Sequence, residues 1–152
     1  MDRLIVRAAS LADLAAAESL ARAAFEELRR FYRPKDSAPA TSSGLRLVAE
    51  VDGRLVGTVL YEIESDHVHL RGLAVDSRYR RLGVARSLVE HLSGLATAAE
   101  LPALSLYTIK QTGNVAVFER LGFRTIREEA ATWATRDDGE QPIDVYMQKT
   151  VS

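Results

Sequence analysis

The chain has no cysteine, and this absence removes several kinds of chemistry at once. Without thiols there is no disulfide framework, no thiolate zinc site and no covalent acyl-cysteine intermediate. Histidine is also scarce, because only three are scattered along the 152 residues. Three separate histidines without cysteine form no cluster of ligands, so the sequence predicts no metal site.

Long apolar runs and an excess of one charge are missing as well. No apolar segment approaches the length of a membrane span, and the first residues lack the apolar core of a signal peptide. We therefore expect a cytoplasmic protein without a membrane partner. The formal net charge is -1, so no global field attracts nucleic acid, and we expect no nucleic-acid partner.

What is present is the composition of a soluble globular protein, with 47% hydrophobic and 27% charged residues. A chain of this length buries a sizeable core in one domain. The polar run KDSAPATSSG at 35–44 predicts a loop, and no boundary there demands a second domain. We predict a single domain over residues 1–152.

The stretch LAVDSRYRRLGVARS, residues 73–87, is the most informative in the chain. Its first three residues predict the end of a buried strand, and apolar residues at helical spacing predict a helix from about 83 to 99. The first turn of a helix carries unpaired N–H groups and the positive end of the macrodipole, which together suit a phosphate. Gly83 and Ala85 leave room for one. The residues alone allow two interpretations: a diphosphate site, or an ordinary loop with arginines in solvent.

Two motifs in the chain resemble those of a known family. Arg80-x-x-Gly83-x-Ala85 after Leu-Ala-Val resembles the diphosphate signature of the GNAT (Gcn5-related) N-acetyltransferases. The segment from Asn114 through Phe118 to Gly122-Phe123 resembles the family's second signature, although a capped amphipathic helix also explains it locally.

The predicted order of elements agrees with this resemblance. The expected strands are 4–7, 45–51, 54–64, 67–75, 103–108, 123–135 and 143–151, and the expected helices are 11–28 (one broken helix or two), 83–99 and 114–121. Asp52-Gly53 predicts a tight hairpin, while the crossover helix at 83–99 predicts a parallel pair of strands. The fold class is therefore a mixed, mostly antiparallel sheet of six to seven strands with helices on both faces, which is the GNAT fold.

The resemblance implies acetyl-CoA as cosubstrate and assigns residues to it. Leu73, Ala74 and Val75 would hold the pantetheine arm, and the Val75 amide would polarise the thioester carbonyl. The diphosphate would lie on a loop made of Arg80, Arg81, Leu82, Gly83, Val84, Ala85, Arg86 and Ser87. Asn114 would contact the arm of the cofactor, and Phe118 would pack beside its sulfur.

The implied reaction is direct attack of an amine on the acetyl thioester. Family members often protonate the departing thiolate with a tyrosine in the second motif, but here that position is Phe118, which has no proton to donate. A thiol pKa of about 8.5 makes the thiolate a tolerable leaving group, so the position of the general acid stays empty.

A base must take the proton of the amine, and the sequence offers two candidates. Strand alternation predicts that His67, His69, Arg71, Leu73 and Val75 share one face. His69 is the first candidate, because an ordinary histidine pKa of ~6.5 suits proton transfer at neutral pH. Glu62 on the preceding strand is the second. The alternatives are a half-exposed strand histidine and a carboxylate in solvent.

The resemblance also indicates where the acceptor enters, between residues 25–44 and 133–141. Asp137, Asp138 and Glu140 could attract a cationic amine beside Trp133 or Tyr32, or could form a solvated turn. Tyr61 and Tyr107 are expected to be packing residues. We expect an acetyl-CoA-dependent N-acetyltransferase acting on a small-molecule or peptide amine. The alternative is a non-catalytic acyl-CoA-binding sensor, and the edge of the last strands is compatible with a homodimer.

Overall fold

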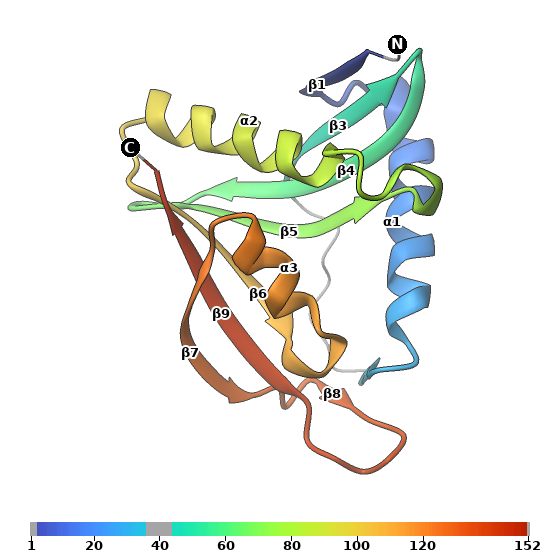
Figure 1. Ribbon diagram of the computed structural model, residues 1–152, viewed down its shortest axis with the longest axis vertical. Coiled ribbons are helices and arrows are strands. Elements are labelled where there is room, and N and C mark those ends of the chain that lie inside the picture. Colours follow the sequence, from blue (N-terminus) through green and yellow to red (C-terminus); the bar gives the residue numbers. More distant parts are fainter. Residues whose placement is uncertain (1–2, 36–43, 152) are drawn as a thin grey trace.

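A computed structural model describes residues 3–35 and 44–151, so most of the loop expected at 35–44 lies outside the described residues. A seven-stranded sheet has the order β1-β3-β4-β5-β6-β9-β7 (Figure 1). Its strands are β1 (Leu4–Ala8), β3 (Leu45–Val51), β4 (Arg54–Ile63), β5 (Val68–Val75), β6 (Ala103–Ile109), β7 (Arg124–Ala130) and β9 (Ile143–Thr150). Every neighbouring pair is antiparallel except β5 with β6. The predicted fold class is confirmed.

Helical segments lie between the strands as expected. They are η1 (Leu11–Asp13), α1 (Leu14–Leu28), η2 (Ser77–Tyr79), α2 (Val84–Ala98), η3 (Lys110–Thr112) and α3 (Asn114–Arg120). The helix predicted over 11–28 is thus a short 3-10 turn followed by α1. The turn is fixed where Ser10 N–H donates to Asp13 Oδ2 over 2.7 Å, which makes a capping box. Among the described residues, no helix is long and apolar enough to cross a membrane.

The core lies between the sheet and α2. Its largest fully buried side chains come from both layers: Leu47, Leu70, Leu88, Leu92, Leu104, Leu106 and Met147. Phe118 from α3 packs against the edge of the same core. Helix α1 packs on the opposite face, against β4 and β5 (Figure 1). Because each apolar helix face is buried against the sheet, the hydrophobic effect fixes both layers.

A β-bulge in β5 breaks the alternation that the sequence predicts. Arg71 pairs with Leu60 and Ala74 pairs with Thr58, so two residues, Gly72 and Leu73, lie opposite one. Gly72 has φ +65°, a conformation that glycine adopts without strain. Cross-strand partners share a face, so Ala74, and not Leu73 or Val75, continues the face of His69 and Arg71.

The expectation of one face for all five side chains was therefore wrong. Leu73 and Val75 pack against the core beneath α2. The physical reason is that one extra residue in a strand reverses the direction of every side chain after it.

Strands β5 and β6 separate soon after they meet. Their parallel ladder consists of Val68 with Leu104 and His69 with Ser105. Beyond this pair the strands diverge, and the sheet opens toward their carboxyl ends. Carboxyl ends of adjacent parallel strands are a usual place for ligands in open sheets.

The last part of the chain differs from the sequence prediction in two ways. The strand expected over 123–135 is split, because β8 (Ala134–Thr135) leaves the sheet and pairs with β2 (Arg33–Pro34) at the end of α1. Tyr61 is buried as expected. Tyr107 is 45% exposed, so it is not a core residue, although its ring packs against that of Tyr146 at 4.9 Å.

Gly57 provides a test of how α2 is seated on the sheet. A Cβ atom there would stand 2.6 Å from Val84 Cγ1 and 3.2 Å from Leu88 Cδ1. We expect Gly57→Ala to push the first turns of α2 away and to lower the free energy of unfolding by about 1–3 kcal/mol. Denaturant unfolding measures the change.

Gly94 in α2 is the matched control for this substitution. In the described part of the chain, no atom lies within 4 Å of the position of its Cβ. Gly94→Ala should therefore stabilise the helix by about 0.5–1 kcal/mol. If Gly57→Ala and Gly94→Ala changed the free energy of unfolding by the same amount and in the same direction, the close packing of α2 on Gly57 would be contradicted.

Candidate active site

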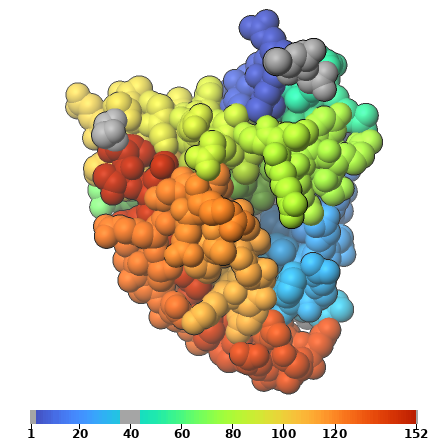
Figure 2. All heavy atoms as spheres, in the orientation of Figure 1, coloured from blue at the N-terminus to red at the C-terminus, as the bar shows by residue number. Residues whose placement is uncertain are grey.

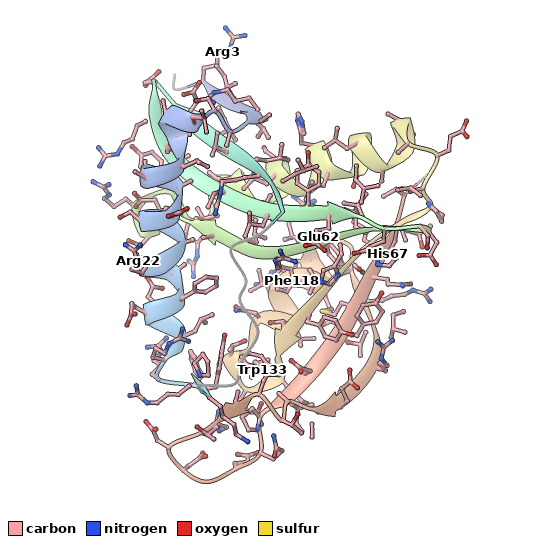
Figure 3. The ribbon with its side chains drawn as sticks, turned by 180° about the vertical axis from the view of Figure 1, so that it is seen from behind. Arg3, Arg22, Glu62, His67, Phe118 and Trp133 are labelled. Carbon is pink, nitrogen blue, oxygen red and sulfur yellow. The ribbon has the colours of Figure 1, made fainter. Side chains whose placement is uncertain are left out.

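A cavity of about 150 Å3 occupies the opening between β5 and β6. Its walls come from the two diverging strands, the end of α1, α3 and the segment before β8. They include Phe25, Leu28, Tyr32, residues 70–73 and 106–109, Asn114, Phe118, Trp133 and Asp144. In Figure 3, Phe118 lies near the middle of the molecule and Trp133 farther toward β2. The structure thus brings Leu73, Asn114 and Phe118, which the sequence predicted separately, to one cavity.

The amino end of α2 offers unpaired backbone donors near this opening. Ser87 is the first residue whose N–H reaches a carbonyl of its own turn, that of Gly83 over 2.9 Å. The amides of Val84, Ala85 and Arg86 precede it and point out of the helix end. Gly83 has φ +82°, and among described atoms nothing lies within 4 Å of the position of its Cβ. An open helix end of this kind binds anions.

Two arginines of the predicted loop make contacts with neighbouring helices. Arg80 Nη2 lies 2.8 Å from Glu27 Oε2 on α1. Arg86 Nη2 donates to the carbonyl of Arg120, at the end of α3, over 3.0 Å. The loop before α2, in green, therefore meets α1, in blue, and α3, in orange, in the space-filling view (Figure 2). Besides the backbone amides, the other N–H groups of these two guanidinium groups are left as donors for an anion.

The backbone N–H of Val75 points toward the opening between β5 and β6. The N–H of the next residue, Asp76, donates to Val56 on β4 over 2.8 Å. Successive amides of a strand point to opposite edges. The N–H of Val75 therefore points to the other edge, where β6 has already diverged. Ala74 and Val75 do not line the cavity itself, but they continue β5 from the cavity toward α2.

Phe118 presents a purely apolar surface to the cavity. Its ring lies 6.0 Å from that of Phe123 in an edge-to-face arrangement and packs against the core. No proton donor can come from this side chain.

His69 lies beside the cavity and not in its wall. Its Nδ1 is 2.8 Å from Ser105 Oγ, at the last pair of the parallel ladder, and its ring is 5.8 Å from that of Tyr107, which does line the cavity. Burial lowers the pKa of His69, and the charges of His67 and Arg71 lower it further. Its imidazole is consequently neutral at neutral pH.

Glu62 is the cross-strand partner of His69. Its carboxylate lies 2.9 Å from Arg71 Nη2 and is 39% exposed. Like His69, it does not line the cavity.

The acidic residues predicted to attract an amine are paired with arginines. Asp138 lies 2.8 Å from Arg136, which holds the pKa of Asp138 at about 2. Glu140 lies 4.0 Å from the same Arg136, and Asp137 lies 3.2 Å from Arg33. These contacts fix the loop after β8 and leave the carboxylates outside the cavity.

Among the residues that the structure describes, the carboxylate that lines the cavity is that of Asp144, which sequence reasoning missed. Trp133 Nε1 donates to Asp144 Oδ2 over 2.9 Å, and Tyr32 packs edge-on against Trp133 at 5.5 Å. Burial raises the pKa of Asp144. In the sequence, Asp144 is a polar residue between two apolar neighbours, a pattern that indicates a strand but not a site. Its position at the opening depends on the pairing of β9 with β6, where Asp144 lies opposite Ile109.

Comparison with known proteins now adds to this geometry. The sequence model of the acetyltransferase (GNAT) family matches residues 11–123. The chain belongs to this family. It is therefore an acetyl-CoA-dependent N-acetyltransferase, and acetyl-CoA is its cosubstrate. No curated protein matches the acetyltransferase in sequence.

Solved structures resemble the acetyltransferase over almost its whole length. The ribosomal-protein-S18-alanine N-acetyltransferase from Escherichia coli is 19% identical with a TM-score of 0.74, covering 99% of this chain and 95% of that one. Nourseothricin acetyltransferase is 16% identical with a TM-score of 0.74, covering 98% and 99%. A protein from Salmonella typhimurium described as an acetyltransferase, with its cofactor acetyl-CoA, is 17% identical with a TM-score of 0.73, covering 99% and 95%. At these identities the likeness shows the fold.

The open amino end of α2 leads to a binding prediction. Gly83→Glu places a carboxylate at the helix end where the diphosphate is expected, and like charges there repel. We expect calorimetric titration to show at least ~100-fold weaker binding of acetyl-CoA, in keeping with the loss of about 3 kcal/mol of charge-assisted bonding.

Gly139→Glu is the matched control, because Gly139 has φ +80° and equally open surroundings in the described structure, but lies in the loop before β9. It adds the same charge and the same backbone strain, and acetyl-CoA should bind as it does to the unchanged protein. If Gly83→Glu bound acetyl-CoA with unchanged affinity, the diphosphate would not bind at this helix end.

Proposed function

We propose that the acetyltransferase holds acetyl-CoA between β5 and β6 and transfers the acetyl group to a primary amine that enters from the side of α1. The observation that carries this proposal is the cavity between the diverging strands, next to the open amino end of α2. The diphosphate binds to amides at residues 81–86, assisted by the loop from Arg80 to Ser87. The pantetheine arm runs along residues 73–75 and passes Asn114.

The chemical step is addition of the amine followed by loss of the thiolate. The nitrogen lone pair of the neutral amine attacks the carbonyl carbon, and the N–H of Val75 stabilises the negative charge that develops on oxygen. The C–S bond then breaks, and coenzyme A leaves with the electron pair as thiolate. The new amide nitrogen gives up one proton to a base.

His69 is the proposed final acceptor of that proton. Its lowered pKa keeps the ring unprotonated at neutral pH, as a base requires. Because His69 lies outside the cavity wall, the proton reaches the imidazole through water. Glu62, held by Arg71, is the second candidate.

No residue is assigned as general acid, because Phe118 occupies the position at which the family's tyrosine is expected. A thiolate with a conjugate acid of pKa about 8.5 can leave unassisted. The same phenylalanine favours a second candidate function, an acyl-CoA sensor that binds without turnover. Only measured turnover distinguishes the two.

The remaining expectations stay predictions from the sequence. They are the single domain over 1–152, the cytoplasmic location, the lack of nucleic-acid or membrane partners and a homodimer. Strand β7 supports the last of these, since it is an edge strand with exposed side chains throughout.

The proposed function is tested by titrating the protein with acetyl-CoA and then assaying thiol release with a panel of amines and N-terminal peptides. We expect saturable binding and thiol release with one class of amine, because the cavity joins the cofactor site to the acceptor side. Binding without release across the panel would favour the sensor.

His69 is tested by the pH profile of the same reaction. We expect kcat/KM, calculated on the concentration of neutral amine, to fall only as the pH drops below the ordinary histidine pKa of 6.5, because the pKa of His69 is lowered and the base is lost when it is protonated. His69→Gln should reduce kcat by about 100-fold and abolish this acidic limb. The control variant His67→Gln, two residues away, should keep both the kcat and the acidic limb of the unchanged protein. If the acidic limb persisted in His69→Gln, the base would be a residue other than His69.

A further inference from the structure

Asp144 differs from the other acidic groups that the structure describes around the acceptor side. The carboxylates of Asp137, Asp138 and Glu140 are bound by arginines outside the cavity. Asp144 lies in the cavity wall, and its hydrogen-bond partner is the neutral N–H of Trp133. A carboxylate bonded to a neutral donor keeps its negative charge uncompensated.

The neighbours of Asp144 do not cancel this charge. On β7 its cross-strand partner is Glu129, another carboxylate, and on β6 its partner is the apolar Ile109. Of the described cations, Arg71 in the cavity wall is paired with Glu62, and Arg29 lies over the Tyr32 ring at 5.7 Å. The site therefore has the electrostatic character that attracts a cation.

The walls next to Asp144 are aromatic and apolar. Tyr32 and Trp133 meet edge-to-face at 5.5 Å, and Phe25 and Leu28 of α1 complete the same side. Aromatic faces attract ammonium groups, and apolar walls favour an apolar body. A cavity of about 150 Å3, which must also admit the acetyl thioester, leaves room for a compact molecule only.

We propose that Asp144, with Trp133 and Tyr32 around it, binds the ammonium group of the acceptor, and that the acceptor is a compact primary amine with an apolar body. Asp144 acts as a specificity-determining residue: it selects a cationic amine and holds its nitrogen on the acceptor side of the opening. The bound ammonium first gives one proton to solvent water, and the neutral amine that results then attacks the thioester. The inference rests on the proposed function, because the ammonium that it binds is that of the acceptor.

Trp133 is the only tryptophan of the chain, so its fluorescence reports directly on this site. The experiment titrates the protein, without acetyl-CoA, with 2-phenylethylamine and with 2-phenylethanol, which has nearly the same shape but no charge. We expect the amine to bind at least ~10-fold more tightly than the alcohol, as one charge-assisted contact provides.

Asp144→Asn keeps an acceptor oxygen for Trp133 and removes the charge. The preference for the amine over the alcohol should disappear in this variant, while the affinity for acetyl-CoA stays the same. Each preference is the ratio of the two affinities, for amine and for alcohol, measured on the same variant. A change in the fluorescence intensity of Trp133 caused by the substitution therefore does not affect it. Asp137→Asn, which removes a carboxylate paired with Arg33, is the matched control and should keep the full preference.

Three outcomes would overturn the inference: equal binding of amine and alcohol, no binding of either, or an amine preference that survives in Asp144→Asn. These outcomes are distinct from failure of the proposed function. Amine binding through Asp144 without thiol release would refute acetyl transfer and leave the ammonium site intact. Thiol release with an unaltered preference in Asp144→Asn would refute the ammonium site alone.

Discussion

The arrangement of the site depends on one short ladder of hydrogen bonds, the parallel pairing of β5 with β6. It joins residues 68–69 to residues 104–105 and then ends. Had the pairing continued, the amides of β5 would have been used within the sheet, and no space would remain between the strands.

The bulge at Gly72 adds to this effect, because an extra residue raises the local twist of the strand. It also directs Leu73 and Val75 to the α2 side, while His69 and Arg71 stay on the side of α1. One strand thus presents different side chains to the two helical layers.

The second constraint is the close seating of α2. Gly57 lets Val84 and Leu88 approach the sheet more closely than any side chain on β4 would permit. This contact fixes the open amino end of the helix relative to the opening between the strands. Arg80 and Arg86 then connect the same loop to α1 and α3. The helix end and the strand edge, which we propose bind different parts of one cofactor, are thereby held in a fixed relation.

The sequence was sufficient for the fold, and insufficient for the side-chain directions in β5 and for the carboxylate in the cavity wall. Helical spacing after Gly83 and the hairpin at Asp52-Gly53 are local patterns, so they predict local structure well. The bulge at Gly72 is not local: a single glycine in a strand does not reveal an extra residue, and the assignment of His69 and Leu73 to one face failed for this reason. Asp144 was missed because its position depends on pairing with β6, more than thirty residues earlier. The acidic run at 137–140 stood out in the sequence, yet arginines from distant and neighbouring positions pair with it.

Amide hydrogen exchange with and without acetyl-CoA tests the central claim most directly, because that claim concerns backbone N–H groups. The account predicts slower exchange in two separate places, at Val75 with its neighbours in β5 and at residues 83–86, where the donors lack partners in the free protein. The amides of β7 should exchange equally fast in both states. Protection by acetyl-CoA that spares both the β5 edge and the start of α2 would contradict the account.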